Sequence, residues 1–213
     1  MKTKITLVLL IFFAMIVSVY NYVHSFDSSS EKITDLPLSA TVTPFFIAAS
    51  DYAPTMDSLV IPYLDRLRVT GTFTSGTHSI AYDYYLIESA KANIVISHGF
   101  TERKEKYQEL AYYFLSWGYQ VFILDHFGHG NSTRIVPDSS MVYVDRYETF
   151  TNDLHQFITT VVEKQGKGLK TILFGHSMGG GIAARTVQIF PDIVDGLILN
   201  APMMKIGNAP PDL

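Results

Sequence analysis

The chain has 213 residues, of which 47% are hydrophobic and 17% charged, a composition typical of a globular protein with one substantial core. Its net charge of −4, without a cluster of Lys and Arg, argues against a nucleic-acid partner. The sequence contains no cysteine, which excludes disulfides, thiolate metal sites and a cysteine nucleophile.

The N-terminal segment has the layout of an export signal. Lys2 and Lys4 precede an uncharged apolar run over residues 5–19, and polar residues follow. Ser25 is a small residue at a passable cleavage site, so we expect residues 1–25 to be a signal peptide. Without cleavage, residues 5–23, 19 in all, are just long enough to anchor the chain in a bilayer. In both cases we expect the folded part outside the cytoplasm, exported to the periplasm or secreted, or held at the membrane.

Residues 26–62 are expected to form a linker and an N-terminal extension. The stretch DSSSEKITD is typical of a linker, whereas PFFIAASDYAP and LVIPYL contain apolar residues that can pack, with prolines that should break any long element. After this region, two alternating runs flank Gly76-Thr77-His78 and predict a β-hairpin over residues 68–87.

The rest of the chain alternates between strand and helix patterns. We predict, in order, a strand at 92–97, a helix at 104–117, a strand at 119–124, a long loop, a helix at about 146–163, a strand ending before Ser177, a helix stopped by Pro191 and a strand at 196–200. This order predicts an α/β fold with a doubly wound, mostly parallel sheet that follows an antiparallel hairpin. Such sheets bind ligands beyond the carboxyl ends of their strands, where Ser177 falls.

The stretch LKTILFGHSMGGGIAART, residues 169–186, leads from an apolar strand through a glycine-rich turn into a helix. Residues 175–179 match G-x-S-x-G, in which a serine sits on a strained strand-to-helix turn with its hydroxyl above the sheet. Glycine is needed on both sides because a Cβ there would strike the strand or the helix. We expect Ser177 to be a catalytic nucleophile; the alternative is a glycine-rich corner without chemistry.

A second strand end carries His98-Gly99-Phe100, which is similar to the His-Gly loop that donates a backbone N–H to an oxyanion hole. Ester cleavage needs such donors because negative charge grows on the carbonyl oxygen in the transition state. The two donors are expected to be the N–H groups of Phe100 and Met178. The alternative is an ordinary His-Gly turn.

A third strand end carries DHFGHGNS, residues 125–132, which we interpret as a structural turn. Asp125 is expected to cap backbone groups, and the histidines to form local hydrogen bonds. A zinc site at His126 and His129 lacks a third ligand, so we predict no metal and no cofactor. Asp153 is expected to be a packing carboxylate on a helix face.

Four segments together resemble the monoglyceride lipase and bacterial lysophospholipase branch of the α/β-hydrolase superfamily. They are SHGFTERKEKYQELAYYF, FILDHFGHGNS, FGHSMGGGIAARTVQIFP and LILNAPM, and the resemblance covers about residues 63–206. It implies an eight-stranded doubly wound sheet, a Ser-His-Asp triad, no cofactor, and hydrolysis of single-chain acyl esters such as lysophospholipids or monoacylglycerols. The chain departs from the pattern at Phe127, where relatives commonly have arginine.

The resemblance also implies a substrate-binding role for two charged residues. The family has an acidic residue and a basic residue near the polar head of the substrate, at positions that match Glu102 and Lys106. The alternative is two solvated charges that open a helix.

The family triad runs Ser, Asp, His along the chain, but here only Asp192, Asp195 and Asp212 follow Ser177, and no histidine does. We therefore expect residues 63–213 to be an incomplete α/β-hydrolase domain that lacks the C-terminal strands and cap. The alternative function is an inactive fragment or a noncatalytic binding protein. Two ways of restoring activity stay open: His126 or His129 could act as the base, or a second polypeptide could supply the missing strands. Acyl transfer in place of hydrolysis, and peptides or thioesters as substrates, also stay open.

Overall fold

A computed structural model of the protein describes residues 46–138 and 141–204. All of these residues belong to one compact unit, Pro44–Leu213. The expected signal peptide or anchor at 1–25, the extension before residue 46, and Asp212 lie outside the described residues. Within the described ranges, no helix has the length and apolar character needed to cross a bilayer.

A helical segment precedes the sheet. It consists of η1 (Ala49–Asp51), α2 (Tyr52–Thr55), the π-helical turn η2 (Met56–Val60) and α3 (Ile61–Leu67), which follow one another without a break. The expectation that prolines break this region is therefore wrong for residues 49–67. Pro54 lies in the opening turn of α2. Pro62 directly follows the π-helical turn η2, where the Ile61 N–H donates to the carbonyl of Met56, five residues before it.

Six strands form one mixed sheet in the order β1-β2-β4-β3-β5-β6. The β1–β2 hairpin and the β2–β4 pair are antiparallel, and the other pairs are parallel. This confirms the predicted fold class. The strands are β1 (Arg68–Ser75), β2 (His78–Tyr85), β3 (Asn93–Ser97), β4 (Gln120–Leu124), β5 (Thr171–His176) and β6 (Gly196–Asn200).

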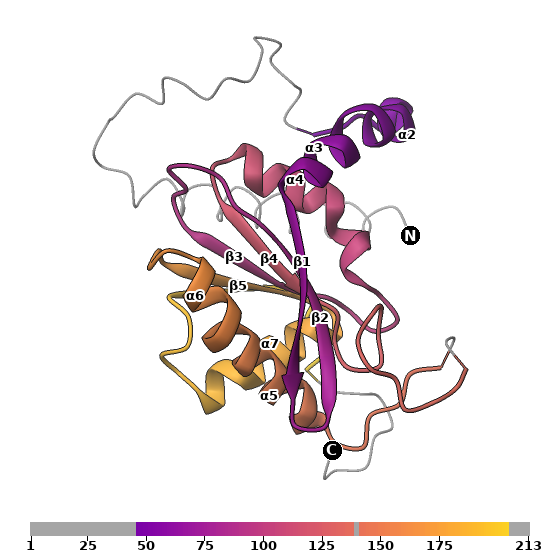
Figure 1. The fold of residues 1–213 in the computed structure, drawn as a ribbon, viewed down its shortest axis with the longest axis vertical. Helices are drawn as coiled ribbons and strands as arrows, with labels where there is room; N and C mark the ends of the chain where they lie inside the picture. The colour runs from indigo at the N-terminus through magenta and orange to yellow at the C-terminus, as the bar shows by residue number, and fades with distance from the viewer. Residues whose placement is uncertain (1–45, 139–140, 205–213) are drawn as a thin grey trace, which may run out of the picture. The chain divides into compact units, whose positions relative to one another are not determined.

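Helices cover both faces of the sheet (Figure 1). One face carries α3 and the pair η3 (Lys104–Tyr107) and α4 (Gln108–Ser116). The other carries α5 (Tyr147–Phe157), η4 (Ile158–Val162), α6 (Glu163–Gln165) and α7 (Met178–Ile189). Every residue of β3 and β4 is buried, which explains why their sequences, NIVIS and QVFIL, are nearly continuous apolar runs.

The main core lies between the sheet and the helices α5 and α7. Val95, Phe122 and Leu173 project from three neighbouring strands, and all three are 0% exposed. They belong to one apolar cluster with Leu154 of α5 and Ile182 of α7. Burial of these side chains is the main favourable term that holds the helices on the sheet.

The parallel register aligns the carboxyl ends of the central strands. Ser97 of β3 lies opposite Gly175 of β5, and His176 of β5 lies opposite Asn200 of β6. The loops that follow β3, β4, β5 and β6 therefore leave the sheet at the same edge, which brings the candidate site residues together.

Leu154→Ala should lower the free energy of unfolding by about 2–5 kcal/mol, because it opens a cavity in a core position that is 0% exposed. Urea unfolding followed by circular dichroism measures the change. The matched control is Leu59→Ala on η2, where Leu59 is 40% exposed and the loss should stay below about 1 kcal/mol. Equal losses in the two variants would contradict the assignment of the core.

Candidate active site

Ser177 occupies the sharp turn between β5 and α7. Its backbone has φ 51° and ψ −119°, a left-handed conformation that non-glycine residues rarely adopt. Backbone hydrogen bonds hold it there: the Ser177 N–H donates to the carbonyl of Asn200 at 3.0 Å, and its carbonyl accepts from Met203 at 2.8 Å and from Gly180 at 3.0 Å. The strained turn is thus fixed from β6 and from the loop that follows it.

The glycines around Ser177 permit close backbone contacts. A Cβ at Gly175 would lie 2.7 Å from the carbonyl oxygen of Gly179, and one at Gly180 would lie 2.8 Å from Cβ of Pro202. A Cβ at Gly179 would overlap the carbonyl groups of Ser97 and His98 at the end of β3. The start of α7 therefore packs directly on the end of β3, which no larger residue would allow.

The loop after β3 lies against the serine turn. A Cβ built on Gly99 would be 3.3 Å from Cβ of Ser177, so the two backbones are neighbours. Neither the N–H of Phe100 nor that of Met178 donates a hydrogen bond to another residue in the described ranges. The Ser177 hydroxyl likewise has no hydrogen-bond partner among the described residues. Two backbone donors and a hydroxyl without internal partners therefore lie in one region, as an oxyanion hole requires.

Glu102 lies just behind this loop and is held by three donors. Its Oε2 accepts from the Gly99 N–H at 2.8 Å and from the Tyr107 hydroxyl at 2.6 Å, and its Oε1 accepts from Lys106. Burial acts to raise the pKa of Glu102, but these hydrogen bonds outweigh it and lower the pKa to about 2. The carboxylate therefore stays charged at neutral pH.

Glu102 and Lys106 differ in exposure. The Glu102 side chain is 11% exposed and that of Lys106 is 64% exposed. The reading of both as solvated charges is thus wrong for Glu102, because the side chain points inward to the Gly99 loop. Their role at a substrate headgroup remains a prediction.

An open pocket of about 220 Å³ adjoins these residues. On the β5 side, His176 directly precedes Ser177, and its Nε2 is 4.0 Å from Oε1 of Glu102. The pocket therefore combines charged groups, such as Glu102 and Lys106, with the apolar side chains of Leu110 and Phe174. Its lining residues are Glu102, Lys106, Tyr107, Glu109, Leu110, Phe174, His176 and Asn200.

Three buried histidines lie beside the same loops. The Nδ1–H of His98 donates to the carbonyl of Gly99 at 2.8 Å, and its Nε2 accepts from the His126 N–H at 3.0 Å, which fixes one neutral tautomer. Burial lowers the pKa of His98 to about 4 and also lowers the pKa values of His126 and His129. The predicted local hydrogen bonds are confirmed, since His126 Nε2 lies 2.9 Å from Ser97 Oγ and His129 Nδ1 lies 2.9 Å from the Phe127 carbonyl.

These histidines do not form the alternative sites considered for them. No hydrogen bond joins His126 or His129 to Ser177 in the part of the chain that is described, which leaves a base role for either without geometric support. The described residues also contain no group of three or more His, Cys, Asp or Glu placed to hold a metal ion.

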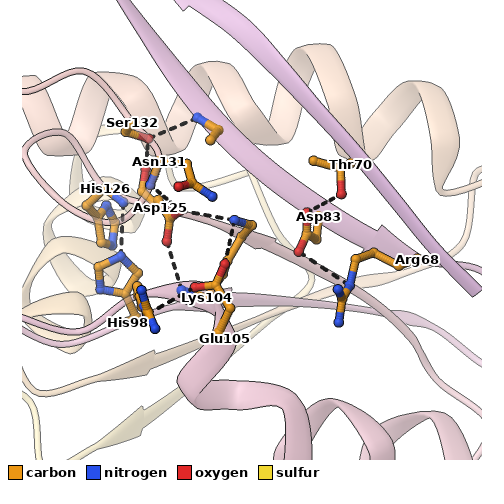
Figure 2. A network of polar contacts seen from close by, with 12 residues as sticks. Arg68, Thr70, Asp83, His98, Lys104, Glu105, Asp125, His126, Asn131 and Ser132 are labelled. Atoms are coloured by element: carbon orange, nitrogen blue, oxygen red, sulfur yellow. Dashed lines mark hydrogen bonds and ion pairs between the residues drawn. The ribbon is translucent and has the colours of Figure 1, made fainter. Parts of the chain in front are cut away.

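A buried polar network connects the loops after β3 and β4 (Figure 2). The carboxylate of Asp125 accepts from the N–H of Lys104 at 2.8 Å, from Nζ of Lys104 at 3.2 Å and from the N–H of Asn131 at 2.9 Å. The prediction that Asp125 caps backbone groups is confirmed.

Other carboxylates have structural contacts away from the serine. Asp153 of α5 is 1% exposed and lies 2.9 Å from Nε2 of His78, which confirms its packing role. Asp195 accepts from the Thr171 N–H at 2.8 Å, at the amino end of β5 and so at the opposite edge from Ser177. Phe127 is buried with its ring 4.5 Å from that of His78.

The sequence comparisons agree with this geometry. Residues 88–213 match the family described as serine aminopeptidase, S33, and the chain belongs to that family. It is 37% identical over 113 residues to lysophospholipase L2 of Escherichia coli K12, and 35% identical over 114 residues to monoglyceride lipase of Homo sapiens. These alignments cover 53% and 54% of this chain but 33% and 36% of the relatives. The chain thus spans about a third of the length of these two proteins.

Solved structures give the same fold. A thermostable carboxyl esterase from Bacillus coagulans superposes with a TM-score of 0.56 at 27% identity, over 62% of this chain and 44% of the esterase. A soluble variant of monoglyceride lipase from Saccharomyces cerevisiae also gives 0.56, at 24% identity, over 64% of this chain and 44% of that protein. The α/β-hydrolase fold and the resemblance to the lysophospholipase and monoglyceride lipase branch are confirmed.

Six of the pocket residues, among them His176, Tyr107 and Asn200, were not singled out from the sequence. His176 directly precedes Ser177 and shares a sheet face with Phe174, a relation that the two-residue period of a strand could have revealed. Tyr107 follows Lys106, but its bond to Glu102 depends on the fold of η3. Asn200 joins the site only through the register of β5 with β6, which the sequence does not encode locally.

Gly179→Ala should destabilise the protein by about 1–3 kcal/mol, because the new methyl group meets the backbone of β3 rather than a flexible side chain. Urea unfolding measures the loss. Gly196→Ala is the matched control, since a Cβ there is 3.6 Å from Ile172, an ordinary contact, and the change should lie within about 1 kcal/mol of neutral. If Gly179→Ala is as well tolerated as the control, α7 does not pack on β3 as described.

Glu102→Gln should weaken the dependence of the protein's stability on pH in the acid range. Because the folded protein lowers the pKa of Glu102 from 4.5 to about 2, its contribution is complete above about pH 4.5 and is lost as the pH falls toward 2. Thermal melting at pH 7, 4 and 2.5 should show a difference between wild type and variant that shrinks with acidity. The exposed Glu163→Gln serves as the control, with a difference that stays constant. A constant difference for Glu102→Gln as well would contradict the assignment.

Proposed function

We propose that this chain acts as a serine hydrolase of carboxylic esters, with a lysophospholipid or a monoacylglycerol as substrate and an acyl-enzyme on Ser177. The observation that supports the proposal is the contact between the Ser177 turn and the Gly99 loop, together with the N–H groups of Phe100 and Met178, which donate to no other described residue. Membership of the S33 family and the similarity to lysophospholipase L2 and monoglyceride lipase support it.

In this mechanism Ser177 Oγ attacks the acyl carbonyl carbon and forms a tetrahedral intermediate. The N–H groups of Phe100 and Met178 donate to the oxyanion, and each such donor is worth about 3 kcal/mol of barrier. Collapse of the intermediate breaks the ester bond, and the alcohol leaves with the proton that came from Ser177. Water then attacks the acyl-serine ester and releases the fatty acid, which restores the hydroxyl.

The pocket beside Ser177 supports a substrate with a small polar head. At about 220 Å³ it is smaller than a typical site for a drug-sized ligand, which suits a glycerol or phosphoglycerol group better than an acyl chain. Glu102 offers a charged acceptor and Lys106 a charged donor at its wall. Hydroxyl groups and a phosphate can bind to such a pair.

The Ser177 proton needs an acceptor, and within residues 46–138 and 141–204 no histidine is hydrogen-bonded to Ser177. A serine hydroxyl without a base is a weak nucleophile, and loss of the base alone can lower the rate by about 10⁴ to 10⁶. This observation favours a second candidate function, a lipid-binding protein that keeps the fold and the pocket without turnover.

We also propose that the chain acts outside the cytoplasm, either released or held at the membrane by its N-terminal segment. The support is the order of two lysines, an apolar run and a polar stretch in residues 1–30. Fractionation of cells that express the chain with a C-terminal tag tests this, and recovery of the protein in the cytosol alone would refute it.

Incubation of the full chain with a fluorophosphonate probe should label Ser177, because the probe needs an activated serine and an oxyanion site. Labelling should rise when imidazole is added, since a small diffusible base can take the proton that none of the described histidines is placed to accept. Mass spectrometry of the tryptic peptide with Ser177 gives the site and the rate. An excess of lysophosphatidylcholine should slow labelling if the pocket takes a lipid head.

Ser177→Ala is the control and should abolish labelling, whereas Ser116→Ala on α4 should leave it unchanged. A folded chain that shows no labelling with or without imidazole would refute the hydrolase. Binding of lysophosphatidylcholine by that unlabelled chain, measured by calorimetry, would establish the noncatalytic function in its place.

A further inference from the structure

The loop that carries the Phe100 N–H contains a strained residue. Thr101 has φ +57°, in the left-handed region that a β-branched residue rarely adopts. Two bonds between Gly99 and Glu102 span the residue: the N–H of Glu102 donates to the carbonyl of Gly99 at 3.3 Å, and the N–H of Gly99 donates to Oε2 of Glu102 at 2.8 Å. A strained turn of this kind keeps its geometry only if the surrounding structure fixes both of its ends.

The upstream end of the loop is fixed by the sheet and by α7. Ser97 is the last residue of β3, and its hydroxyl donates to the carbonyl of Gly179 at 3.0 Å. His98 is bonded on both ring nitrogens, to Gly99 and to His126. These contacts account for the position of the chain up to Gly99, but not for the part beyond Thr101.

The downstream end is fixed by Lys104 and Asp125. Arg103, which precedes η3, makes no side-chain capping bond, and the N–H of Lys104 donates instead to Oδ1 of Asp125 at 2.8 Å. The Nζ of the same lysine reaches Oδ2 of Asp125 at 3.2 Å. One residue therefore binds both oxygens of one carboxylate, through its backbone and through its side chain (Figure 2).

Both side chains of the Lys104–Asp125 pair, which we call the clamp, are buried. The side chain of Lys104 is 3% exposed and that of Asp125 is 0% exposed. Burial would lower the pKa of Lys104, but Glu105, Asp125 and Asp83 together raise it, so the ammonium group stays charged. Asp83, on β2, is itself held by Thr70 at 2.8 Å. Charges at such depth are retained only with a partner in good geometry.

We propose that Lys104 is a positioning residue for the oxyanion hole: its ammonium group holds Asp125 in place, and Asp125 in turn fixes the loop from Phe100 to Arg103 against Ser177. The inference about the reaction rests on the proposed function, whereas the inference about loop order does not. Asp125 also holds the Asn131 N–H at 2.9 Å, so the same clamp fixes the turn that carries His129. The ring of His129 lies 5.9 Å from that of Phe100, which completes the contact on the far side of the loop.

The test uses the full chain with Lys104→Met, Asp125→Asn and the double variant. Lys164→Met is the matched control, because it removes the same charge from an exposed position on α6. Hydrogen–deuterium exchange by mass spectrometry is read for residues 99–104, for residues 126–132 and for β5 as an internal reference. The second readout is the rate at which the fluorophosphonate probe labels Ser177.

Lys104→Met should speed exchange at least tenfold in residues 99–104 and 126–132 and leave β5 within twofold of wild type. Labelling of Ser177 should fall about a hundredfold, the usual loss for a displaced oxyanion donor. The double variant should be no worse than either single variant, because the two side chains act as one unit. If Lys104→Met does not fold, the double variant, which removes both charges of the Lys104–Asp125 pair, provides the measurement.

Exchange in residues 99–104 that stays within twofold of wild type would overturn the proposal. So would exchange that rises equally in β5, because that pattern means general loss of stability instead of local displacement. If the wild-type chain takes no label but Lys104→Met still speeds exchange in residues 99–104, the proposed hydrolase function is refuted. The positioning of the loop by Lys104 and Asp125 is then still supported.

Discussion

The contact between the start of α7 and the end of β3 is the constraint on which the rest of the site depends. It exists because Gly179 has no Cβ, so the helix can lie directly on the carbonyl groups of Ser97 and His98. That approach sets the left-handed turn at Ser177 and brings the Gly99 loop beside it. The turn at Ser177 and the Gly99 loop are therefore neighbours through direct contact of their backbones.

Charge near this contact is arranged in two separate groups. Glu102 and Lys106 lie at the wall of the open pocket, where they can meet a ligand. Lys104 and Asp125 lie beneath the loop and meet only other protein groups. Lys104 and Lys106, two residues apart, therefore have opposite environments, because η3 turns the first side chain toward the core and the second toward solvent.

Much of the fold could be predicted from the sequence. The hairpin at β1 and β2 followed from strict alternation, and β6 was predicted with its observed bounds from a short apolar run after Pro191. The helical segment at 49–67 was missed because Pro54 and Pro62 read as breakers, and the sequence does not say where in a helical turn a proline falls. At the site, Ser177 and Gly99 were marked by their motifs. The pairing of Lys104 with Asp125 was not, because a lysine is normally expected in water and the two meet only through the parallel register of β3 and β4.

The hairpin has a further consequence for the outer edge of the sheet. β1 is the terminal strand on that side, and a terminal strand presents unpaired amides that invite pairing with foreign chains. Here the hairpin is fastened to α5 at its tip, by His78 to Asp153 and by Gln156 to the Thr74 carbonyl at 2.7 Å. Helix α5 thus holds the edge of the sheet in place. β1 can separate from the sheet and pair with another chain only if these contacts with α5 break or α5 moves with the hairpin.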